Sequence, residues 1–445
     1  MPTQGHPWPE GPDHPDWQRQ ITSAKILGEK KETRELPIPI EWTRACAARV
    51  QELRSELQRS WVGLELPDGD HLIDWVLAAL IARENVLLLG EPGVAKTQMA
   101  ERTFRLLGLE TPAVHEIPAV PPESGDYRGW WEKREAEERT RQKYFRYLLS
   151  RFTQPEELFG PIEISLLRRG LLVHVNFGLL TGPGVRAAFL DEIFLASSSI
   201  LNQLLTLVLE REYFNWGGMR RADLMMLIGA SNELPGGFAT GSSVRGNGAE
   251  DFNTLYAFLD RFPIRLHIPN ASGGTETEAE NSNLAKAARK AINRAAQQFT
   301  RHDPFDEVNW GRLGPPSVND LLLLGRAMLE QDAGVKGFVL FDPTQLARFT
   351  QAFYRIGASL QQEGTGVREG IISWSVSPRK LMALYKIALA HALVRSNSLG
   401  ESGAASGPDE IDLRVFEWIW DTPGRRDELA KQVHAGVRRH MARGV

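Results

Sequence analysis

The stretch LLLGEPGVAKTQMAERTFRLLG, from Leu87 to Gly108, runs from an apolar segment through a loop with glycine and proline into a helix-like pattern. A strand, a glycine-bearing loop and a helix in this order are typical of a phosphate-binding loop, because successive backbone N–H groups and the positive end of the helix can hold an anion. The eight residues GEPGVAKT match the P-loop pattern, with Ala95 where the second glycine is expected. The alternative is an ordinary glycine and proline turn followed by a helix-capping threonine.

The P-loop interpretation assigns a role to each residue of this loop. Lys96 can neutralise the β and γ phosphates, and the hydroxyl of Thr97 can ligate magnesium. The residues expected to contact the nucleotide are Gly90, Glu91, Pro92, Gly93, Val94, Ala95, Lys96, Thr97 and Gln98.

A second motif, AAFLDE, places Asp191 and Glu192 directly after four apolar residues. Acidic side chains at the tip of a buried strand are costly unless a cation or hydrogen-bond donors meet them. Beside Thr97, Asp191 would hold magnesium, and Glu192 would orient and polarise the attacking water. The alternative is a strand that runs into a helix start, where acidic residues are common. Both motifs in one chain predict binding and hydrolysis of a nucleoside triphosphate. ATP is preferred, because the guanine-reading motif Asn-Lys-x-Asp does not occur.

Apolar runs that alternate with helical patterns predict an α/β fold with a parallel sheet covered on both faces. The expected strands are ENVLLL, YFRYLLSRF, VRAAFLDEIF and ADLMMLIGASN. Before the last of them, one apolar helix face is expected to contain Leu201, Leu204, Leu205, Val208 and Leu209. Lys96 and Asp191 lie 95 positions apart, which is more than one helix and one strand need, so an insertion is expected between them.

The domain organisation follows from changes in composition along the chain. A polar hinge follows RFPIRLHIP, and the residues after the hinge have mostly helical patterns. We expect a flexible arm at 1–38, an α/β nucleotide-binding core at 39–270, a hinge at 271–284, an α-helical domain at 285–397, a linker at 398–408 and C-terminal helices at 409–445.

Composition limits the function classes. The formal net charge is only −4, so bulk attraction to nucleic acid or to an anionic membrane is not expected. No apolar run approaches the ~20 residues of a membrane span. Cys46 is the only cysteine, which excludes an internal disulfide and a cysteine-rich zinc site, and the N-terminus has no signal-peptide pattern. The expected location is the reducing cytoplasm.

The interval from Leu109 to Lys143 is unusually long. Its second half has a charged helical pattern in which Glu135 with Arg139 and Glu137 with Arg141 are spaced for ion pairs. Trp130 and Trp131 in this segment could form a projection that faces a partner, or they could cover an edge of the core.

With these motifs in place, the chain resembles the AAA+ ATPases, and within them the MoxR family, most closely its RavA branch. The resemblance covers roughly residues 40–430 and rests on GEPGVAKT, RFTQPEELFGPIEI, AAFLDEIFLASSSILNQLLTLVLERE, LIGASNELP, LYAFLDRFPIRL and SVSPRK. It implies a P-loop core with a β-α-β helix-2 insert, followed by an α-helical lid. PEELFG would lie in that insert, with Glu156 and Glu157 as helix-start residues rather than catalysts.

The resemblance also implies further site residues. Asn232 looks like sensor 1, which helps to hold the lytic water, although an asparagine before Pro235 also suits a turn. Arg261 looks like the arginine finger that reaches the ATP of a neighbouring subunit. Arg265 is a second candidate, and either arginine could be a surface ion-pair partner. Arg379 looks like sensor 2, which the lid holds against the γ-phosphate.

The function implied by the resemblance is that of a chaperone or remodelling motor. Such a motor assembles or activates a partner complex. For this chain the resemblance implies a homo-oligomer, with a hexamer as the expected form, and a von Willebrand factor A (VWA) protein as the partner. One alternative is a nucleic-acid-stimulated motor, for which Arg220 and Arg221 lie near an expected hairpin. A lone arginine pair is usually solvated, so nucleic acid is not the expected partner. Another alternative is a nucleotide-gated scaffold with little turnover, which the intact Asp191–Glu192 pair disfavours.

Overall fold

The computed structural model describes residues 40–60, 71–90, 92, 94–110, 127–232, 258–268, 314–329, 343–362, 378–395 and 413–418. The expected arm, hinge and linker lie outside these residues, as do Glu91 and Gly93 of the expected phosphate loop. The boundaries proposed for those segments therefore stay predictions.

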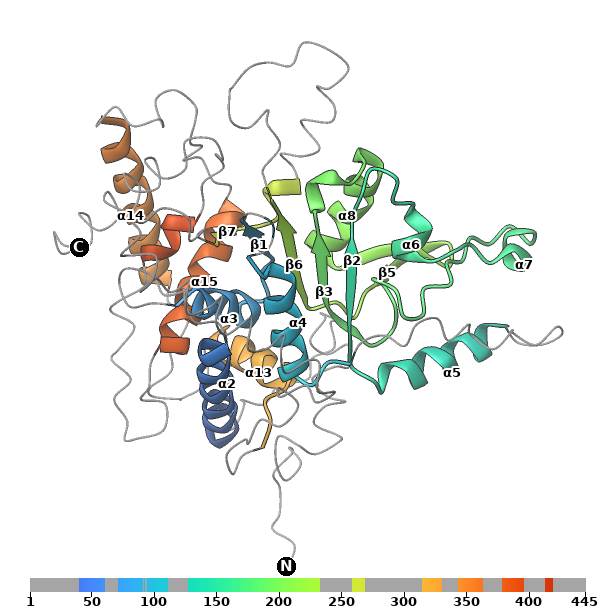
Figure 1. Ribbon diagram of the computed structural model, residues 1–445, viewed down its shortest axis with the longest axis horizontal. Helices are drawn as coiled ribbons and strands as arrows, with labels where there is room; N and C mark the ends of the chain where they lie inside the picture. Colours follow the sequence, from blue (N-terminus) through green and yellow to red (C-terminus); the bar gives the residue numbers. More distant parts are fainter. Residues whose placement is uncertain are drawn as a thin grey trace, which may run out of the picture.

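The centre of the fold is a five-stranded sheet in the order β2-β3-β6-β1-β7 (Figure 1). Every neighbouring pair of these strands is parallel. The strands are β1 (Val86–Leu89), β2 (Lys143–Leu148), β3 (Val185–Asp191), β6 (Met226–Ser231) and β7 (Ile264–His267). The predicted α/β fold with a parallel sheet is confirmed. One detail differs, because β3 ends at Asp191 and the EIF that follows it lies outside the strand.

Successive strand residues face opposite sides of the sheet, and both sides are buried. In β1, Val86 and Leu88 belong to one apolar cluster, whereas Leu87 and Leu89 belong to another. The first side is covered by α3 (Leu72–Ile81) and α4 (Lys96–Leu106), and the second by α6 (Pro155–Phe159) and α8 (Ser198–Glu210). Burial on both sides explains why these strands are continuously apolar rather than alternating.

The apolar face of α8 differs slightly from the expected one. The buried residues of this helix are Ile200, Leu201, Leu204, Leu207 and Val208. Leu205 and Leu209, which were expected on this face, are only half-buried. The buried face of α8 is therefore centred closer to Leu207 than the predicted face was.

Helices from the two ends of the chain share one apolar core. The N-terminal α2 (Ile40–Ser60) and α3 pack against α13 (Val318–Leu329) and α15 (Pro378–Arg395), beside α14 (Pro343–Gln362) and the short helix η3 (Leu413–Trp418) (Figure 1). The ring of Trp75 stacks on that of His391 with the centroids 3.7 Å apart. The arrangement is consistent with a helical lid. None of the described helices combines the length and the apolarity that a bilayer crossing requires.

The long interval before β2 contains α5 (Tyr127–Arg139). Trp131 on this helix is buried in a small cluster with Leu166 and Val173, which is separate from the two clusters beside the sheet. Because Trp131 is covered by this chain, it does not face a partner as one hypothesis held. For Trp130, which is half-buried and packs against the same cluster, that hypothesis stays a prediction. Trp131 also does not cover the edge of the main core, as the other held.

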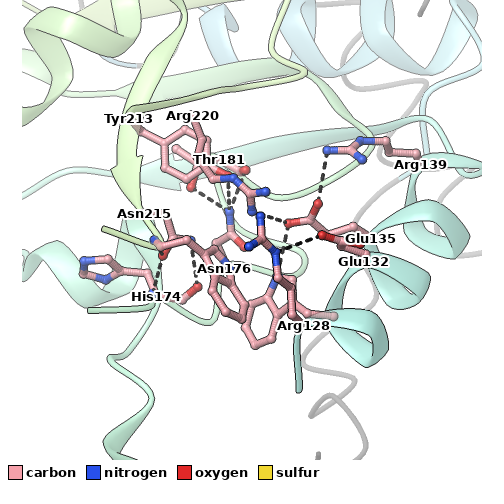
Figure 2. Close-up of polar contacts among 12 residues, drawn as sticks. Arg128, Glu132, Glu135, Arg139, His174, Asn176, Thr181, Tyr213, Asn215 and Arg220 are labelled. Carbon is pink, nitrogen blue, oxygen red and sulfur yellow. Dashed lines mark hydrogen bonds and ion pairs between the residues drawn. The ribbon is translucent and has the colours of Figure 1, made fainter. Parts of the chain in front are cut away.

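Polar contacts lie along α5, and one of them joins this helix to Arg220, shortly before β6 (Figure 2). The carboxylate of Glu135 accepts hydrogen bonds from Trp131 Nε1 at 3.1 Å and from Arg220 Nη1 at 3.2 Å. Arg139 forms the expected ion pair with Glu135, at 3.4 Å. The expected partner of Glu137 was wrong, because Glu137 pairs with Arg134 at 3.6 Å instead of Arg141.

The expected hairpin before β6 is present as β4 (Glu212–Asn215) and β5 (Gly218–Arg221). Trp216 and Gly217 at its turn have φ of 56° and 72°, the left-handed values that tight hairpin turns require. The side chains of Tyr213 and Asn215 reach the segment before β3, where they contact Asn176 and His174 (Figure 2). The hairpin, α5 and this segment thus form one connected lobe.

The segment between β2 and β3 is a reduced form of the expected insert. It contains α6 and α7 (Ile164–Leu167), and a single antiparallel bridge joins Ile162 to His174 on either side of α7. Glu157 accepts a hydrogen bond from the backbone N–H of Gln154 at 2.7 Å and so caps the start of α6. This contact agrees with the structural role expected for Glu157.

Removal of the carboxylate at Asp320 should destabilise the packing between the two ends of the chain. Arg49 lies 2.7 Å from Asp320, and both side chains are buried, so Asp320→Ala removes a carboxylate that faces a buried guanidinium. We expect the free energy of unfolding, measured with urea, to fall by about 3 kcal/mol or more. Arg59→Ala removes an exposed ion pair with Glu56 on α2 and should cost less than about 0.5 kcal/mol. Equal losses in the two variants would contradict this role for Arg49 and Asp320.

Candidate functional site

The start of the loop after β1 lies close to the residue that follows β7. A Cβ at Gly90 would lie 3.1 Å from the carbonyl oxygen of Ile268, so a side chain there would crowd the residue that follows β7. Ala95 precedes α4 and has φ of 64° and ψ of 26°. This left-handed conformation is one that glycine adopts more easily, which explains why the P-loop pattern favours glycine at this position. Val94 packs on the core, whereas Pro92 and Gln98 are exposed.

Lys96 is the first residue of α4 and its side chain is buried. Its ammonium donates hydrogen bonds to the carbonyl oxygen of Gly90 at 2.6 Å and to Asn232 Oδ1 at 2.8 Å. Burial lowers the pKa of Lys96, and the nearby carboxylates of Asp191 and Glu192 oppose that effect. A lysine held in this way presents a positive charge at the end of the sheet.

Thr97 and Asp191 bring two oxygen ligands together. The hydroxyl of Thr97 in α4 donates to Asp191 Oδ2 at the end of β3, with 2.9 Å between the oxygens. In the described part of the chain, no group of three or more His, Cys, Asp or Glu side chains is placed to hold a metal. Magnesium commonly takes only one or two protein oxygens together with substrate phosphates and water. The Thr97 and Asp191 oxygens fit that kind of site.

Glu192 follows Asp191 in a left-handed conformation, with φ of 49° and ψ of 45°. This conformation costs about 1 kcal/mol or more for a residue with a side chain. The Asn232 amide, at the end of β6, donates a hydrogen bond to Glu192 Oε1. Asn232 therefore connects the Lys96 ammonium to the Glu192 carboxylate. The structure thus gathers Lys96, Thr97, Asp191, Glu192 and Asn232 at the C-terminal edge of the sheet.

The two arginines considered for a finger differ in accessibility. The Arg261 side chain is 24% exposed and lies beside Asp260, with 3.4 Å between Nη1 and Oδ2. Arg265 in β7 is 3% exposed, and its Nη2 donates to the carbonyl oxygen of Leu259 at 3.2 Å. Of the two, Arg261 is the one whose side chain can reach outward.

Arg379 is not joined to this group of side chains. It is the second residue of α15, and it is exposed and makes no hydrogen bond or ion pair with another described residue. The next residue, Lys380, is 7% exposed, and its Nζ lies 3.8 Å from Asp260 Oδ1. Sequence reasoning did not single out Asp260 or Lys380. Each is adjacent to a proposed arginine, and no local pattern indicates that the two meet.

Part of the chain is similar to a known protein family. Residues 133–297 match the family described as the MoxR domain in the MoxR-vWA-beta-propeller ternary systems. The matched segment contains Asp191, Glu192, Asn232 and Arg261, while the loop with Lys96 precedes it. The match supports a MoxR-family AAA+ ATPase.

Two uncharacterized proteins of Methanocaldococcus jannaschii are each 34% identical to this chain, over 218 and 194 residues. These alignments cover 49% and 43% of this chain, and 43% and 39% of the relatives, so the chain spans less than half of either relative. The structure is also similar to the crystal structure of a candidate ATPase from Cytophaga hutchinsonii, with a TM-score of 0.51 at 14% identity. That alignment covers 89% of this chain and 95% of the other, and it bears on the fold.

The left-handed conformation at Ala95 yields a stability prediction. Ala95→Gly should relieve the steric cost of that conformation and raise the free energy of unfolding by about 0.5 kcal/mol. The same substitution within α4, Ala100→Gly, should lower it by about 1 kcal/mol, because glycine disfavours a helix interior. Chemical denaturation of both variants measures the difference. A loss of stability in Ala95→Gly as large as that in Ala100→Gly would contradict the conformation described.

Proposed function

We propose that this chain is a MoxR-family AAA+ ATPase that binds Mg-ATP and hydrolyses its terminal phosphoanhydride bond. The observation that carries the proposal is the convergence of Lys96, Thr97, Asp191, Glu192 and Asn232 at one edge of a parallel sheet. Ligands of open α/β sheets bind outside the carboxyl ends of the strands, which is where these side chains lie. The MoxR match over residues 133–297 supports the same assignment.

The phosphates of ATP would bind at the loop between β1 and α4. Backbone N–H groups of residues 90–97 and the N-terminal end of α4 would hold them, with Lys96 neutralising the β and γ phosphates. The hydrogen-bond acceptors of Lys96 include two neutral oxygens, those of Gly90 and Asn232. Phosphate oxygens carry more charge and would make stronger hydrogen bonds to the ammonium, so Lys96 would turn toward them.

Thr97 and Asp191 would hold the magnesium ion. Bound there, magnesium would neutralise negative charge on the β and γ phosphates. The hydrogen bond between Thr97 Oγ1 and Asp191 Oδ2 already aligns the two oxygens across the end of β6.

Glu192 and Asn232 would act on the attacking water. Glu192 would orient the water and accept its proton, and Asn232 would hold the water in line with the γ-phosphate. The hydrogen bond from Asn232 to Glu192 keeps the two groups within reach of one molecule of water. Intact acidic residues at this position favour turnover over a purely structural use of the nucleotide.

The remaining roles need a second subunit and a lid. Arg261 is half-buried on a turn before β7 and would stabilise charge on ATP bound to the neighbouring subunit, as arginine fingers do. Arg379 at the start of α15 would contact the γ-phosphate when the lid closes. We therefore infer a homo-oligomer, with a hexamer as the proposed form.

The cellular role that fits best is assembly or activation of a partner complex. The description of the matched family names vWA and beta-propeller components, which supports a VWA-domain protein as the partner of this chain. A RavA-like branch and a cytoplasmic location belong to the same proposal. Of the two arginines that raised the nucleic-acid alternative, Arg220 is paired with Glu135 and Arg221 is exposed, so that alternative stays the less favoured prediction.

Glu192→Gln tests the catalytic assignment. The amide keeps the size of the side chain but cannot accept the proton, so ATP should still bind while phosphate release falls at least ~100-fold. Titration calorimetry and a phosphate-release assay measure the two properties. Glu210→Gln changes an exposed carboxylate at the end of α8 and should leave both unchanged. Near-normal turnover in Glu192→Gln would refute the role.

Mixing subunits tests whether Arg261 acts on a neighbour. Arg261→Ala should bind ATP normally but lose turnover ~1,000-fold, and Lys96→Ala should lose nucleotide binding. A mixture of the two variants contains interfaces with an intact Lys96 on one side and an intact Arg261 on the other. Phosphate release by the mixture should therefore exceed that of either variant alone. A mixture no more active than its components would exclude a finger in trans.

A further inference from the structure

The turn that carries Arg261 has a fixed backbone. Phe258, Leu259 and Phe262 are buried in the apolar cluster beside α8. The carbonyl oxygen of Arg261 accepts a hydrogen bond from Asn85 Nδ2 at 3.0 Å, just before β1. Because the main chain is held on both sides, the movable part of this residue is its side chain.

One carboxylate lies between two cations from different parts of the chain. Asp260 Oδ2 is 3.4 Å from Arg261 Nη1, and Asp260 Oδ1 is 3.8 Å from Lys380 Nζ. Arg261 belongs to the turn before β7, whereas Lys380 is the third residue of α15. Asp260 is therefore shared between a proposed finger and a helix of the proposed lid.

Lys380 is an unusual residue at this position. Its side chain is 7% exposed and lies in the first turn of a helix, where the backbone N–H groups disfavour a positive charge. Burial and, to a smaller degree, the guanidinium of Arg265 lower the pKa of Lys380 to about 7, while Asp260 opposes the shift. The Lys380 ammonium therefore loses its proton near neutral pH more readily than that of an exposed lysine.

The rest of α15 is anchored to the core. Lys386, six residues after Lys380, forms an ion pair with Glu84, which follows α3. His391 stacks on Trp75 within α3. These contacts set where the first turn of α15 lies relative to the strand that follows Arg261, so the distance from Lys380 to Asp260 depends on how α15 is seated.

We propose that Lys380 is a positioning residue for the Arg261 finger and that it acts through Asp260. A carboxylate that faces a single cation holds it more firmly than one that is shared between two. The Lys380 ammonium attracts the Asp260 carboxylate and so weakens the ion pair between Asp260 and Arg261. The Arg261 guanidinium can then extend toward the neighbouring subunit. The seating of α15 in one subunit thereby influences hydrolysis in the next. This inference rests on the proposed function.

Lys380→Met removes the charge and keeps an unbranched apolar side chain in the buried site. Asp260 would then pair with Arg261 alone, and at pH 6.5 we expect the turnover number to fall about five-fold with an unchanged KM for ATP, the size of effect expected for a partly exposed ion pair. Lys380→Arg should restore most of the loss. Arg128→Met removes an exposed ion pair with Glu132 on α5, without contact to α15 or Asp260, and should leave turnover unchanged.

The pH profile separates this role from a purely structural one. As the pH rises through about 7, Lys380 loses its proton and releases Asp260 to Arg261, so the turnover of the unmodified protein should fall toward that of Lys380→Met. The two should coincide above about pH 8.5, and Lys380→Arg, which stays charged, should lack this step. Besides Asp260, the charged group of the described residues that acts on Lys380 is Arg265, and Arg265 is not altered in these variants.

Asp260→Asn supplies an independent arm. Without the carboxylate, residue 260 forms no ion pair with Arg261 or with Lys380. Adding Lys380→Met to Asp260→Asn should therefore change turnover no further. The inference is overturned if Lys380→Met equals the unmodified protein at every pH, if it is reduced equally at every pH, or if its effect persists beside Asp260→Asn. The subunit-mixing experiment with Arg261→Ala uses neither residue, so failure of the finger and failure of Lys380 are distinguishable.

Discussion

The hydrogen bond between Thr97 and Asp191 is the contact on which the geometry of the site depends. β1 and β3 are not neighbours, because β6 lies between them, and adjacent strands are about 4.8 Å apart. For Thr97 to reach Asp191 at 2.9 Å, the chain that leaves β1 must cross the end of β6. That crossing covers Asn232, which follows β6, and brings it within hydrogen-bond distance of Lys96. The parallel arrangement makes this possible, since it directs all three strand ends to one edge.

The charges at this edge are held apart by a neutral group. The Lys96 ammonium and the Glu192 carboxylate both bind the amide of Asn232, on its oxygen and its nitrogen respectively. Glu192 reaches the amide from a left-handed backbone conformation that costs free energy. A direct contact between ammonium and carboxylate would satisfy both groups within the protein. The intervening amide instead leaves each charge able to interact with another group.

The parts of the fold that were predictable from sequence are those determined by nearby residues. The apolar runs located β1, β2, β3 and β6, and the Trp216–Gly217 turn agrees with the expected hairpin. The helical period of α8 was less informative, because Leu205 and Leu209 lie on one flank of its apolar face and Leu207 lies on the other, so the packing of the helix decides which flank is buried. Trp131 was misjudged for the same reason. Its helix is highly charged, and only the hairpin and the segment around Val173, both distant in sequence, cover it.

For the site, sequence motifs identified the residues that the structure gathers around Lys96, because P-loop and acidic-pair patterns are short and local. Their chemical roles stay predictions, as do those of Arg261 and Arg379. The left-handed conformation of Glu192 had no local signal, since glycine or asparagine is the usual residue there. The contact between Asp260 and Lys380 joins residues that are far apart in the chain. Pairings of that kind follow from how α15 packs against α3, which no pattern within either helix specifies.

The packing of the two ends of the chain against each other also affects the order of folding. Arg49 and Asp320 are 271 positions apart, and the apolar faces of α2 and α3 are completed by α13 and α15. Ribosomes add about 5–20 residues per second, so the N-terminal helices wait roughly 15–55 seconds for these partners during synthesis. Throughout that time their apolar faces are available to other chains or to chaperones. The β-strands emerge in the meantime, and so the sheet can form before the helices that complete its covering.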